Sequence, residues 1–492
     1  MTTDVAGKTK KSLYWNVSLK IPYEIFKFIM SIATARILDP SDFGIVSIAT
    51  FAIYYSNSFT NFGFNQALIQ RSEITDDHIN SVFTFDLVIS ILLSLIIFFS
   101  SEFIAEFFNS PESNNVIKVL SVIFIITTLH DLPYVLMKRD IEFKVIAIVD
   151  MLKEVSMAIL TFALAYAGLK YWSIVWGQII PLFFSMLYLL FKMKRRLKIV
   201  YHHEALKELF NFSIWSFVNM QISFIHNRID RIVIGKGLNV ESLGIYEKSK
   251  ALIQMPSTSI VDNITAVLFS SFSRAQNDSN EIKKIFTKGL VIISIINFPI
   301  FFGIYSLASH FVLVLLGDKW IEMIMPLQIL SIFGIVASIN GLLSVLAIST
   351  GYYKEYVIKF TLSTILLVFS SVIAVDYGLE AVGVALIIST IILFVLSFRL
   401  VNSIYMITWK KLLFSILPSL LSCLVMVSII EVFKIFYLTE INLISFFSLV
   451  VIGIVSYSIA LLVVPSTSIN DIRISVYRDL SKQISKIIRP KN

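Results

Sequence analysis

The sequence predicts an all-α, polytopic membrane protein with about 14 transmembrane helices, in two six-helix lobes related by pseudo-two-fold symmetry and two further C-terminal helices. Its 492 residues are 57% apolar and 15% charged, whereas soluble domains average about 45–50% and 25%. A bilayer-crossing helix needs about 20 mostly apolar residues, so the chain has room for about a dozen or more spans. Lys and Arg concentrate in alternate connectors, which is the positive-inside pattern.

The expected spans follow the apolar segments in order. With the N-terminus in the cytoplasm, the basic connectors all fall on the cytoplasmic side, and the opposite connectors hold little more than Lys170, Lys236 and Lys319. Both termini are therefore predicted to be cytoplasmic. The spans lie near residues 12–37, 43–68, 79–107, 114–137, 143–168, 171–192, 208–234, 242–272, 284–316, 322–350, 355–376, 380–406, 411–437 and 441–464.

These spans divide the chain into five parts. No connector is long enough to bury a core of its own, so no soluble catalytic domain is expected. The formal charge of +8 resides in the connectors and does not indicate a nucleic-acid partner. The predicted parts are an N-terminal lobe (1–192), a basic cytoplasmic connector (193–207), a C-terminal lobe (208–406), spans thirteen and fourteen (407–465) and a cytoplasmic amphipathic tail on the membrane surface (466–492).

An internal repeat supports the two lobes. RILDPSDFGIV, which begins at Arg36, recurs as KGLNVESLGIY, which begins at Lys236, so that Gly44 corresponds to Gly244 at an offset of 200 residues. Each copy falls on the short turn that joins the first two spans of a half. Six spans per half is an even number, so both halves face the same way and are related by an axis along the membrane normal.

The first span carries charges within the bilayer. Lys20, Glu24 and Lys27 follow i, i+4, i+7 spacing, which places them on one helical face. An ionisable side chain near the bilayer centre costs about 2.5–3.5 kcal/mol, so this face is expected to look into protein or water. The alternative is a structural ion pair of Glu24 with either lysine.

Other spans carry further charged candidates. Arg228, Asp230 and Arg231 lie on span seven, which is too polar to face lipid over most of its circumference. Asp86, Asp150 and Glu154 in the first half are candidates for ion coupling, with structural pairing as the alternative. Lys248 and Lys250 on span eight could instead snorkel to the headgroups. No metal site is predicted: His202, His203 and Glu204 lie in a basic connector and have no second ligand set.

Two longer segments carry a family resemblance. ARILDPSDFGIVSIATFAIYYSNSFTNFGFNQALIQRSEIT, from Ala35 to Thr75, resembles the N-terminal signature of Wzx-type polysaccharide exporters, in the colanic-acid and teichuronic-acid branch of the multidrug/oligosaccharidyl-lipid/polysaccharide (MOP) exporter superfamily. LGIYEKSKALIQMPSTSIVDNITAVLFSSFSRAQND, from Leu243 to Asp278, is similar to the same family's repeat of that signature.

The resemblance implies a flippase, not an enzyme, that moves an undecaprenyl-diphosphate-linked oligosaccharide across the bacterial inner membrane by alternating access through a cationic cavity. It implies proton or sodium coupling without another cofactor, contact with membrane lipids, a monomer, and a polysaccharide polymerase and chain-length regulator as partners. The residues expected to attract the substrate are Lys20, Lys27, Arg36, Arg228, Arg231, Lys248 and Lys250, and those expected to couple ions are Glu24, Asp86, Asp150, Glu154 and Asp230.

Two other functions remain open from the sequence. A small-molecule or multidrug exporter of the same superfamily would share the fold, although cationic drugs would prefer an acidic cavity. A membrane-embedded polymerase or glycosyltransferase would need a sizeable outer loop with acids or bases, and the sequence offers none.

Overall fold

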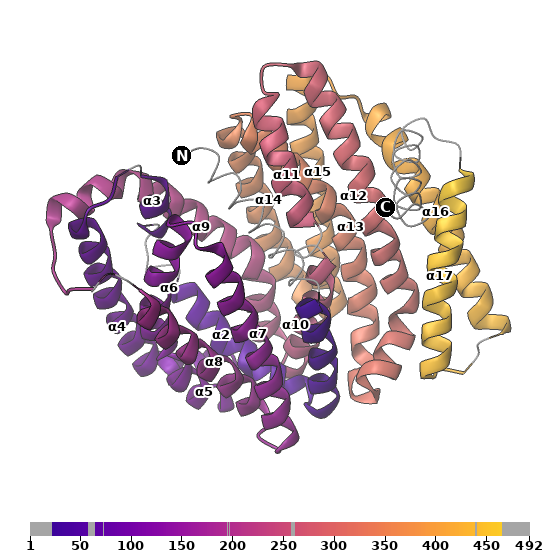
Figure 1. Cartoon of the computed structure of the whole chain (residues 1–492). Helices are drawn as coiled ribbons and strands as arrows, with labels where there is room; N and C mark the ends of the chain where they lie inside the picture. Colours follow the sequence, from indigo (N-terminus) through magenta and orange to yellow (C-terminus); the bar gives the residue numbers. More distant parts are fainter. Residues whose placement is uncertain are drawn as a thin grey trace, which may run out of the picture. The chain divides into compact units, whose positions relative to one another are not determined.

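The computed structural model describes residues 22–57, 64–71, 73–193, 195, 197–256, 261–437 and 440–464. Over these ranges the chain is helical and contains no strand, which confirms the all-α prediction (Figure 1). The chain divides into two compact units, Met1–Glu247 and Lys248–Asn492. Lys20 and the predicted tail helix at 466–492 lie outside the described residues.

The first unit contains the helices up to the first half of α10. The predicted break after span one falls at Leu38 and Asp39, and its repeat falls at Leu238 and Asn239. Span four is broken after Leu120. The helices are Pro22–Ile37, α2 (Pro40–Asn57), α3 (Phe64–Gln70), α4 (Asp76–Phe107), α5 (Glu112–Leu120), α6 (Ile123–Arg139), α7 (Phe143–Tyr166), α8 (Tyr171–Lys192), α9 (His203–Gly237) and α10 (Val240–Pro256).

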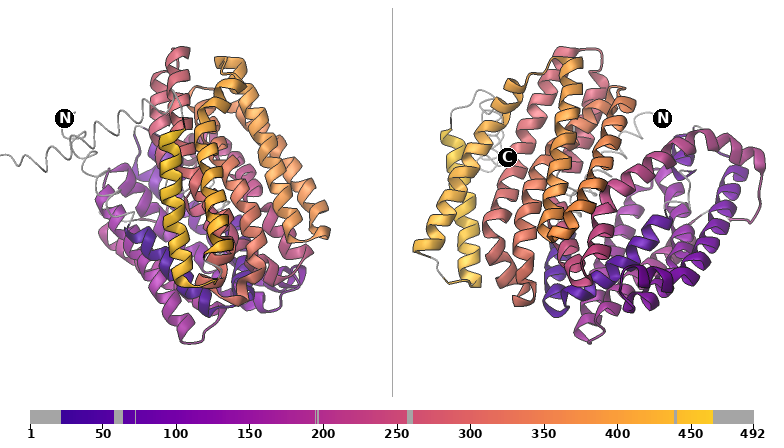
Figure 2. Two further views of the ribbon diagram at one scale, coloured as in Figure 1. Left: turned by 90° about the vertical axis from the view of Figure 1, so that its right-hand side faces the viewer. Right: turned by 180° about the vertical axis from the view of Figure 1, so that it is seen from behind.

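The second unit is built from long helices. A continuous core joins α12, α13, α15 and α16 around residues such as Phe286, Leu342 and Phe398, and α17 lies beside α16 (Figure 2). The elements are α11 (Asp262–Arg274), α12 (Ser279–His310), a π-helix η2 (Phe311–Leu316), a 3-10 helix η3 (Asp318–Met323), α13 (Ile324–Ser349), α14 (Tyr353–Ala374), a 3-10 turn η4 (Val375–Tyr377), α15 (Leu379–Tyr405), α16 (Trp409–Phe436) and α17 (Leu443–Val463).

Helix α4 has one face buried in the protein and another exposed face of large apolar side chains. Its buried stripe contains Asp86, Ser90 and Ser94, whereas Phe99 and Phe103 are 78% and 71% exposed. In a bilayer, small polar side chains favour helix contacts and large apolar ones face the acyl chains. The register of α4 therefore turns Asp86 into the protein.

Nine helices within the described ranges are long and apolar enough to cross a bilayer, and the helices Pro22–Ile37 and Pro40–Tyr54, bent by 116°, count together as a tenth candidate. The nine are Asp76–Phe107, Glu112–Arg139, Tyr171–Lys192, Ser279–Leu316, Asp318–Ser349, Tyr353–Tyr377, Leu379–Tyr405, Trp409–Phe436 and Leu443–Val463.

The other predicted spans are helical but more polar. Helices α7, α9 and α10 contain charged residues singled out in the sequence, and α10 has only 17 residues, so none of the three counts as an apolar span. Helices α7, α9 and α10 thus carry many of the candidate site residues, whereas Asp86 lies on the apolar helix α4. A helix of this kind is stable in a bilayer only where its polar face meets protein or water.

Candidate functional site

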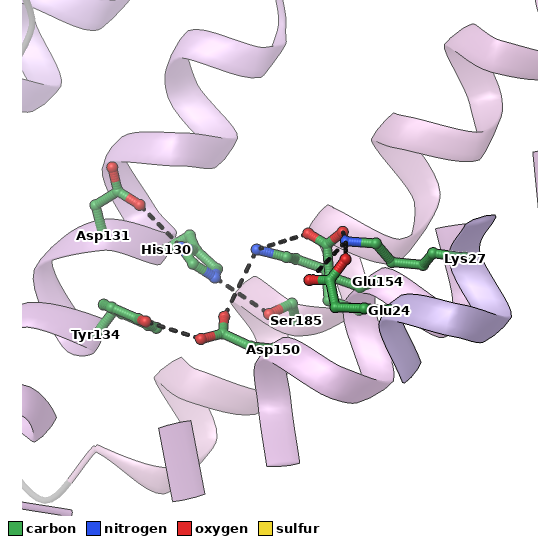
Figure 3. Close-up of polar contacts among 9 residues, drawn as sticks. Glu24, Lys27, His130, Asp131, Tyr134, Asp150, Glu154 and Ser185 are labelled. Atoms are coloured by element: carbon green, nitrogen blue, oxygen red, sulfur yellow. Dashed lines mark hydrogen bonds and ion pairs between the residues drawn. The ribbon is translucent and has the colours of Figure 1, made fainter. Parts of the chain in front are cut away.

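A group of charged side chains joins the helix Pro22–Ile37 to α7 in the first unit; we call Glu24, Lys27, Asp150, Lys153 and Glu154 the α7 cluster (Figure 3). The Lys27 ammonium lies 3.1 Å from Glu154 Oε2 and 3.5 Å from Glu24 Oε2. Glu24 and Lys27 are three residues apart and therefore share a helical face. The cluster thus links residues 127 positions apart in the sequence.

Along α7 the chain of alternating charges continues. The Lys153 ammonium lies 3.7 Å from Asp150 Oδ1 and 3.9 Å from Glu154 Oε1. The Tyr134 hydroxyl donates a hydrogen bond to Asp150 Oδ2 at 2.9 Å. Side chains of the cluster are 20–33% exposed, so they are not sealed in a dry core and can exchange partners.

The described members of the α7 cluster carry more negative than positive charge, whereas the family resemblance implies a cationic cavity. Its described members are three carboxylates and two ammonium groups. Lys27 is shared between two acids, so an anionic ligand would have to compete with Glu24 and Glu154 for it. Conversely, a proton or metal cation taken up by the acids would release Lys27.

Asp86 lies apart from this cluster in a buried position on α4. It is 5% exposed, and within the described part of the chain its Oδ1 has no hydrogen-bond partner. A buried carboxylate without donors is costly in a low dielectric, and Asp131 adds like charge in its vicinity. Asp86 is therefore suited to bind a proton or a cation.

His130 connects Asp131 to the α8 helix. Its Nδ1 lies 2.9 Å from Asp131 Oδ1 and its Nε2 lies 3.1 Å from Ser185 Oγ (Figure 3). The ring stacks on Tyr134 with centroids 5.7 Å apart. Tyr134 in turn reaches Asp150, so the histidine is joined to the α7 cluster through one aromatic residue.

An apolar groove of 520 Å³ between α7 and α8 opens beside these groups. Lys153 and Ser185 lie on its lining among apolar side chains such as Leu160 and Phe184. Polar groups of the site thus border a surface that suits a hydrocarbon chain.

A second network lies where α9 meets α2 and α10; we call Ser47, Asp230, Arg231, Tyr246 and Glu247 the α9–α10 network. The Tyr246 hydroxyl donates to Asp230 Oδ2 at 2.6 Å, and Ser47 Oγ donates to Glu247 Oε1 at 2.9 Å. Arg231 forms an ion pair with Glu247. Asp230, Arg231 and Tyr246 are all buried, so this network is fixed more firmly than the α7 cluster.

Tyr54 on α2 lies beside Arg228 of α9. Its ring centroid is 5.2 Å from the guanidinium carbon of Arg228, a cation–π contact. Tyr54 also interacts electrostatically with Glu154 of the α7 cluster. The structure therefore brings Arg228 of span seven close to Glu154 of the α7 cluster through Tyr54.

The repeated turns meet in a reciprocal contact. A methyl group on Gly44 would lie 1.8 Å from the carbonyl oxygen of Val240, and one on Gly244 would lie 1.8 Å from that of Pro40. The two contacts are equivalent, because Gly44 and Gly244 are 200 residues apart and so are Pro40 and Val240. Ser47 and Glu247, which are hydrogen-bonded to each other, are also 200 residues apart. Helices α2 and α10 can therefore approach this closely only because both positions lack a side chain.

The remaining predicted residues lie elsewhere. Arg36 is exposed near the end of its helix. Lys248 and Lys250 are 6% and 2% exposed on α10. Tyr54, Tyr134 and Lys153 also lie at the site and are not among the residues predicted from the sequence. The i, i+3 spacing of Asp150 and Lys153 could have indicated the last of these, whereas the two tyrosines carry no sequence signal.

Tyr246→Phe tests the α9–α10 network. The variant removes a donor from the fully buried Asp230, so the free energy of unfolding is expected to fall by about 1–3 kcal/mol. Thermal unfolding in one detergent, compared with Tyr54→Phe, measures this. Tyr54→Phe keeps the ring beside Arg228 and is expected to unfold near the wild-type temperature. Equal losses in both variants would contradict the assignment.

Comparisons with known proteins agree with this architecture. A membrane protein in the cps region of Klebsiella pneumoniae is 25% identical over 331 residues, which cover 66% of this chain and 68% of that protein. The lipopolysaccharide biosynthesis protein WzxC of Escherichia coli K12 is 24% identical over 319 residues, 62% of this chain and 63% of WzxC. The match thus spans less than two thirds of WzxC.

The fold is similar to that of a solved flippase. The lipid II flippase MurJ, in an inward closed conformation, superimposes with a TM-score of 0.76 at 16% identity, covering 94% of this chain and 99% of MurJ. Residues 33–325, more than half of the chain, match the family model described as polysaccharide biosynthesis protein. The chain therefore belongs to the polysaccharide biosynthesis protein family.

Proposed function

We propose that the chain is a flippase that moves an undecaprenyl-diphosphate-linked oligosaccharide from the cytoplasmic to the outer leaflet of the bacterial inner membrane. The observation that carries this proposal is the α7 cluster, in which Lys27 pairs with two carboxylates in a partly exposed site. Family membership and the MurJ-like fold support it.

The physical need for such a site follows from the substrate. A diphosphate and a row of sugar hydroxyls cannot enter hydrocarbon without partners, because each charge and unpaired polar group would lose its hydration. Lys27 and Arg228, with Lys20, Arg36, Arg231, Lys248 and Lys250, would provide positive charge along the path. The isoprenoid chain would remain in lipid, and the α7–α8 groove offers an apolar surface for it beside Lys153.

The pairing of Lys27 suggests how transport is coupled to ions. When Glu154 or Glu24 takes up a proton or sodium ion, it loses its hold on Lys27, which can then bind the diphosphate. Loss of that ion restores the lysine–carboxylate pairs and expels the substrate. Asp86, Asp150 and Asp230 are further coupling candidates in this scheme, and Asp86 has the strongest case because its buried Oδ1 lacks a described donor.

Alternating access would come from rocking of two six-helix lobes, residues 1–192 and 208–406, joined by the connector 193–207. Spans thirteen and fourteen (407–465) and the tail 466–492 would complete a fourteen-span monomer with both ends in the cytoplasm. A polymerase and a chain-length regulator that use the exported repeat unit would be its partners.

Reconstitution tests the proposed function directly. The purified chain is placed in liposomes with a fluorescent polyprenyl-diphosphate oligosaccharide, and membrane-impermeant dithionite is added outside. Without flipping, dithionite bleaches only the fluorescent lipid in the outer leaflet. With flipping, lipid from the inner leaflet reaches the outside and is bleached as well. We expect this further loss with the chain and not with the fluorescent sugar on a neutral lipid. Equal bleaching with and without the chain would refute the proposal.

The same vesicles test ion coupling. A proton gradient is expected to speed the loss of the inner-leaflet signal, and collapse of the gradient by an ionophore is expected to reverse this. An ionophore effect seen only with a sodium gradient would assign the coupling to sodium.

A further inference from the structure

A separate titratable group lies in the second unit, at the end of α12. His310 is the last residue of that helix and is 4% exposed. Within the described part of the chain neither of its ring nitrogens has a hydrogen-bond partner. A buried imidazole without partners leaves a donor and an acceptor unsatisfied, which is costly unless the group has a role that requires it.

The nearest charged groups come from α16. The Lys434 ammonium donates to Glu431 Oε1 at 2.8 Å and also to the carbonyl oxygen of Ser306. The Ser306 hydroxyl donates to the same Glu431 oxygen at 2.6 Å. Because Ser306 precedes His310 by four residues, the two lie on one face of α12, about 6 Å apart along its axis. A change of rotamer can therefore move the Glu431 carboxylate toward the imidazole.

The side chains of this group differ in exposure. Glu431 is 46% exposed and Lys434 is 15% exposed, and both lie within six residues of the end of α16. His310 is 4% exposed and interacts electrostatically with both. Glu431 is thus the most exposed member of the group, and His310 is the most buried.

Among the described helices packed around His310, only α16 brings acidic or basic side chains to it. Glu431 and Lys434 are the charged groups that act on His310. Helices α13 and α17 and the π-helix Phe311–Leu316 contain no Asp, Glu, Lys or Arg. Asp318, Lys319 and Glu322 follow in η3, beyond the π-helix.

The backbone at this site is also irregular. The α-helix changes to the π-helix directly after His310, and π-turns are frequent at functional sites because they free a carbonyl and shift the helical register. The Lys434 ammonium binds the Ser306 carbonyl at this junction. Release of Lys434 would therefore remove a hydrogen bond to the backbone near the junction of α12 with the π-helix, and would also move a positive charge away from it.

We propose that His310 and Glu431 form a proton-binding site in the second unit, with Lys434 as the exchangeable counter-charge. The imidazole takes one proton from water and becomes an imidazolium, and the Glu431 carboxylate turns from Ser306 and Lys434 to pair with it. This inference rests on the proposed function only in that proton uptake would serve transport; the site itself is separate from the α7 cluster.

Histidine NMR tests the proton site. The chain contains six histidines, and ¹⁵N-histidine spectra in nanodiscs between pH 5 and 8 distinguish neutral imidazole from imidazolium. The signal missing from His310→Gln identifies His310. We expect this signal to change from neutral to imidazolium as the pH falls, and the imidazolium form at the acidic end to be lost in Glu431→Gln.

Glu281→Gln is the matched control, since Glu281 also pairs with a lysine three residues later but lies on the exposed start of α12. It is expected to leave the His310 signal unchanged. A His310 signal that stays neutral down to pH 5, or that titrates identically in Glu431→Gln, would overturn the proposal. If His310→Gln does not fold, the His310 signal is the one histidine signal that shifts in both Glu431→Gln and Lys434→Gln. If no histidine signal shifts in these two variants, the proposal of a proton site is also overturned.

The titration needs no substrate and so separates the two proposals. Vesicles that show no flipping would refute the proposed function but leave the His310 titration to be judged by itself. Flipping without a titrating His310 would remove the proton site and leave the flippase proposal intact.

Discussion

Lys27→Ala is expected to reduce the flux of the lipid-linked diphosphate by about tenfold or more while the chain still inserts and folds. A tenfold change corresponds to about 1.4 kcal/mol, and loss of a charged contact to a partly buried group commonly exceeds this. The measurement is the initial rate of inner-leaflet bleaching in liposomes, normalised to the amount of folded protein. Arg228→Ala, across Tyr54 from the α7 cluster, is expected to act in the same direction.

Lys284→Ala is the matched control for Lys27→Ala. Lys284 and Glu281 lie 3.5 Å apart at i, i+3 spacing, as Lys27 and Glu24 do, but the Lys284 side chain is 69% exposed and that of Lys27 is 29% exposed. The control therefore removes a lysine and an ion pair without touching the candidate site. Wild-type flux in Lys27→Ala, or the same loss in both variants, would remove Lys27 from the site.

Gly44→Ala is expected to have the largest effect on folding. The added methyl group would lie 1.8 Å from the carbonyl oxygen of Val240, and backbone cannot yield as a flexible side chain does. Separation of α2 from α10 would also disturb the neighbouring Ser47–Glu247 hydrogen bond. Overpacking of this kind costs about 3 kcal/mol, so we expect a lower yield of monodisperse protein and a lower unfolding temperature.

Gly244→Ala and Gly303→Ala complete this test. Gly244 makes the reciprocal contact with Pro40 and is expected to show the same loss, whereas an added methyl group at Gly303 has no atom within 4 Å. Gly303→Ala should be neutral or slightly stabilising, because alanine favours a helix by about 1 kcal/mol over glycine. Similar unfolding temperatures for all three variants would show that the α2–α10 crossing is looser than the structure has it.

Much of the fold was predictable because it depends on local sequence. Apolar segments of sufficient length identify the long helices, and the repeat correctly places breaks at Leu38 and Leu238. The interruption of span four near Leu120 was not predicted, because the residues around it include neither glycine nor proline. The close crossing at Gly44 and Gly244 was also missed, although both glycines were noted, since a repeat does not say which surfaces meet.

The candidate site was predictable residue by residue but not as an arrangement. Helical spacing placed Glu24 and Lys27 on one face and Asp150 and Glu154 on another. Which of these faces meet depends on helix packing, which the spacing within one helix does not determine. The pairing of Lys27 with Glu154 and the place of Tyr54 beside Arg228 therefore appear only in the structure.

That pairing changes how the site is expected to work. A fixed cationic surface would bind a diphosphate at any time, whereas a lysine held by carboxylates binds it only after those carboxylates are neutralised. The second arrangement ties substrate binding to ion binding, which a coupled exporter requires. It also predicts opposite effects for the two partners of one ion pair.

Equilibrium binding of a polyprenyl diphosphate to Glu154→Gln and to Lys27→Gln, each against wild type at neutral pH, tests this central claim most directly. Removal of the competing carboxylate is expected to tighten binding, and removal of the lysine to weaken it, each by about tenfold. Unchanged affinity in both variants, or weaker binding in Glu154→Gln, would contradict the claim that Lys27 is released from Glu154 to receive the diphosphate.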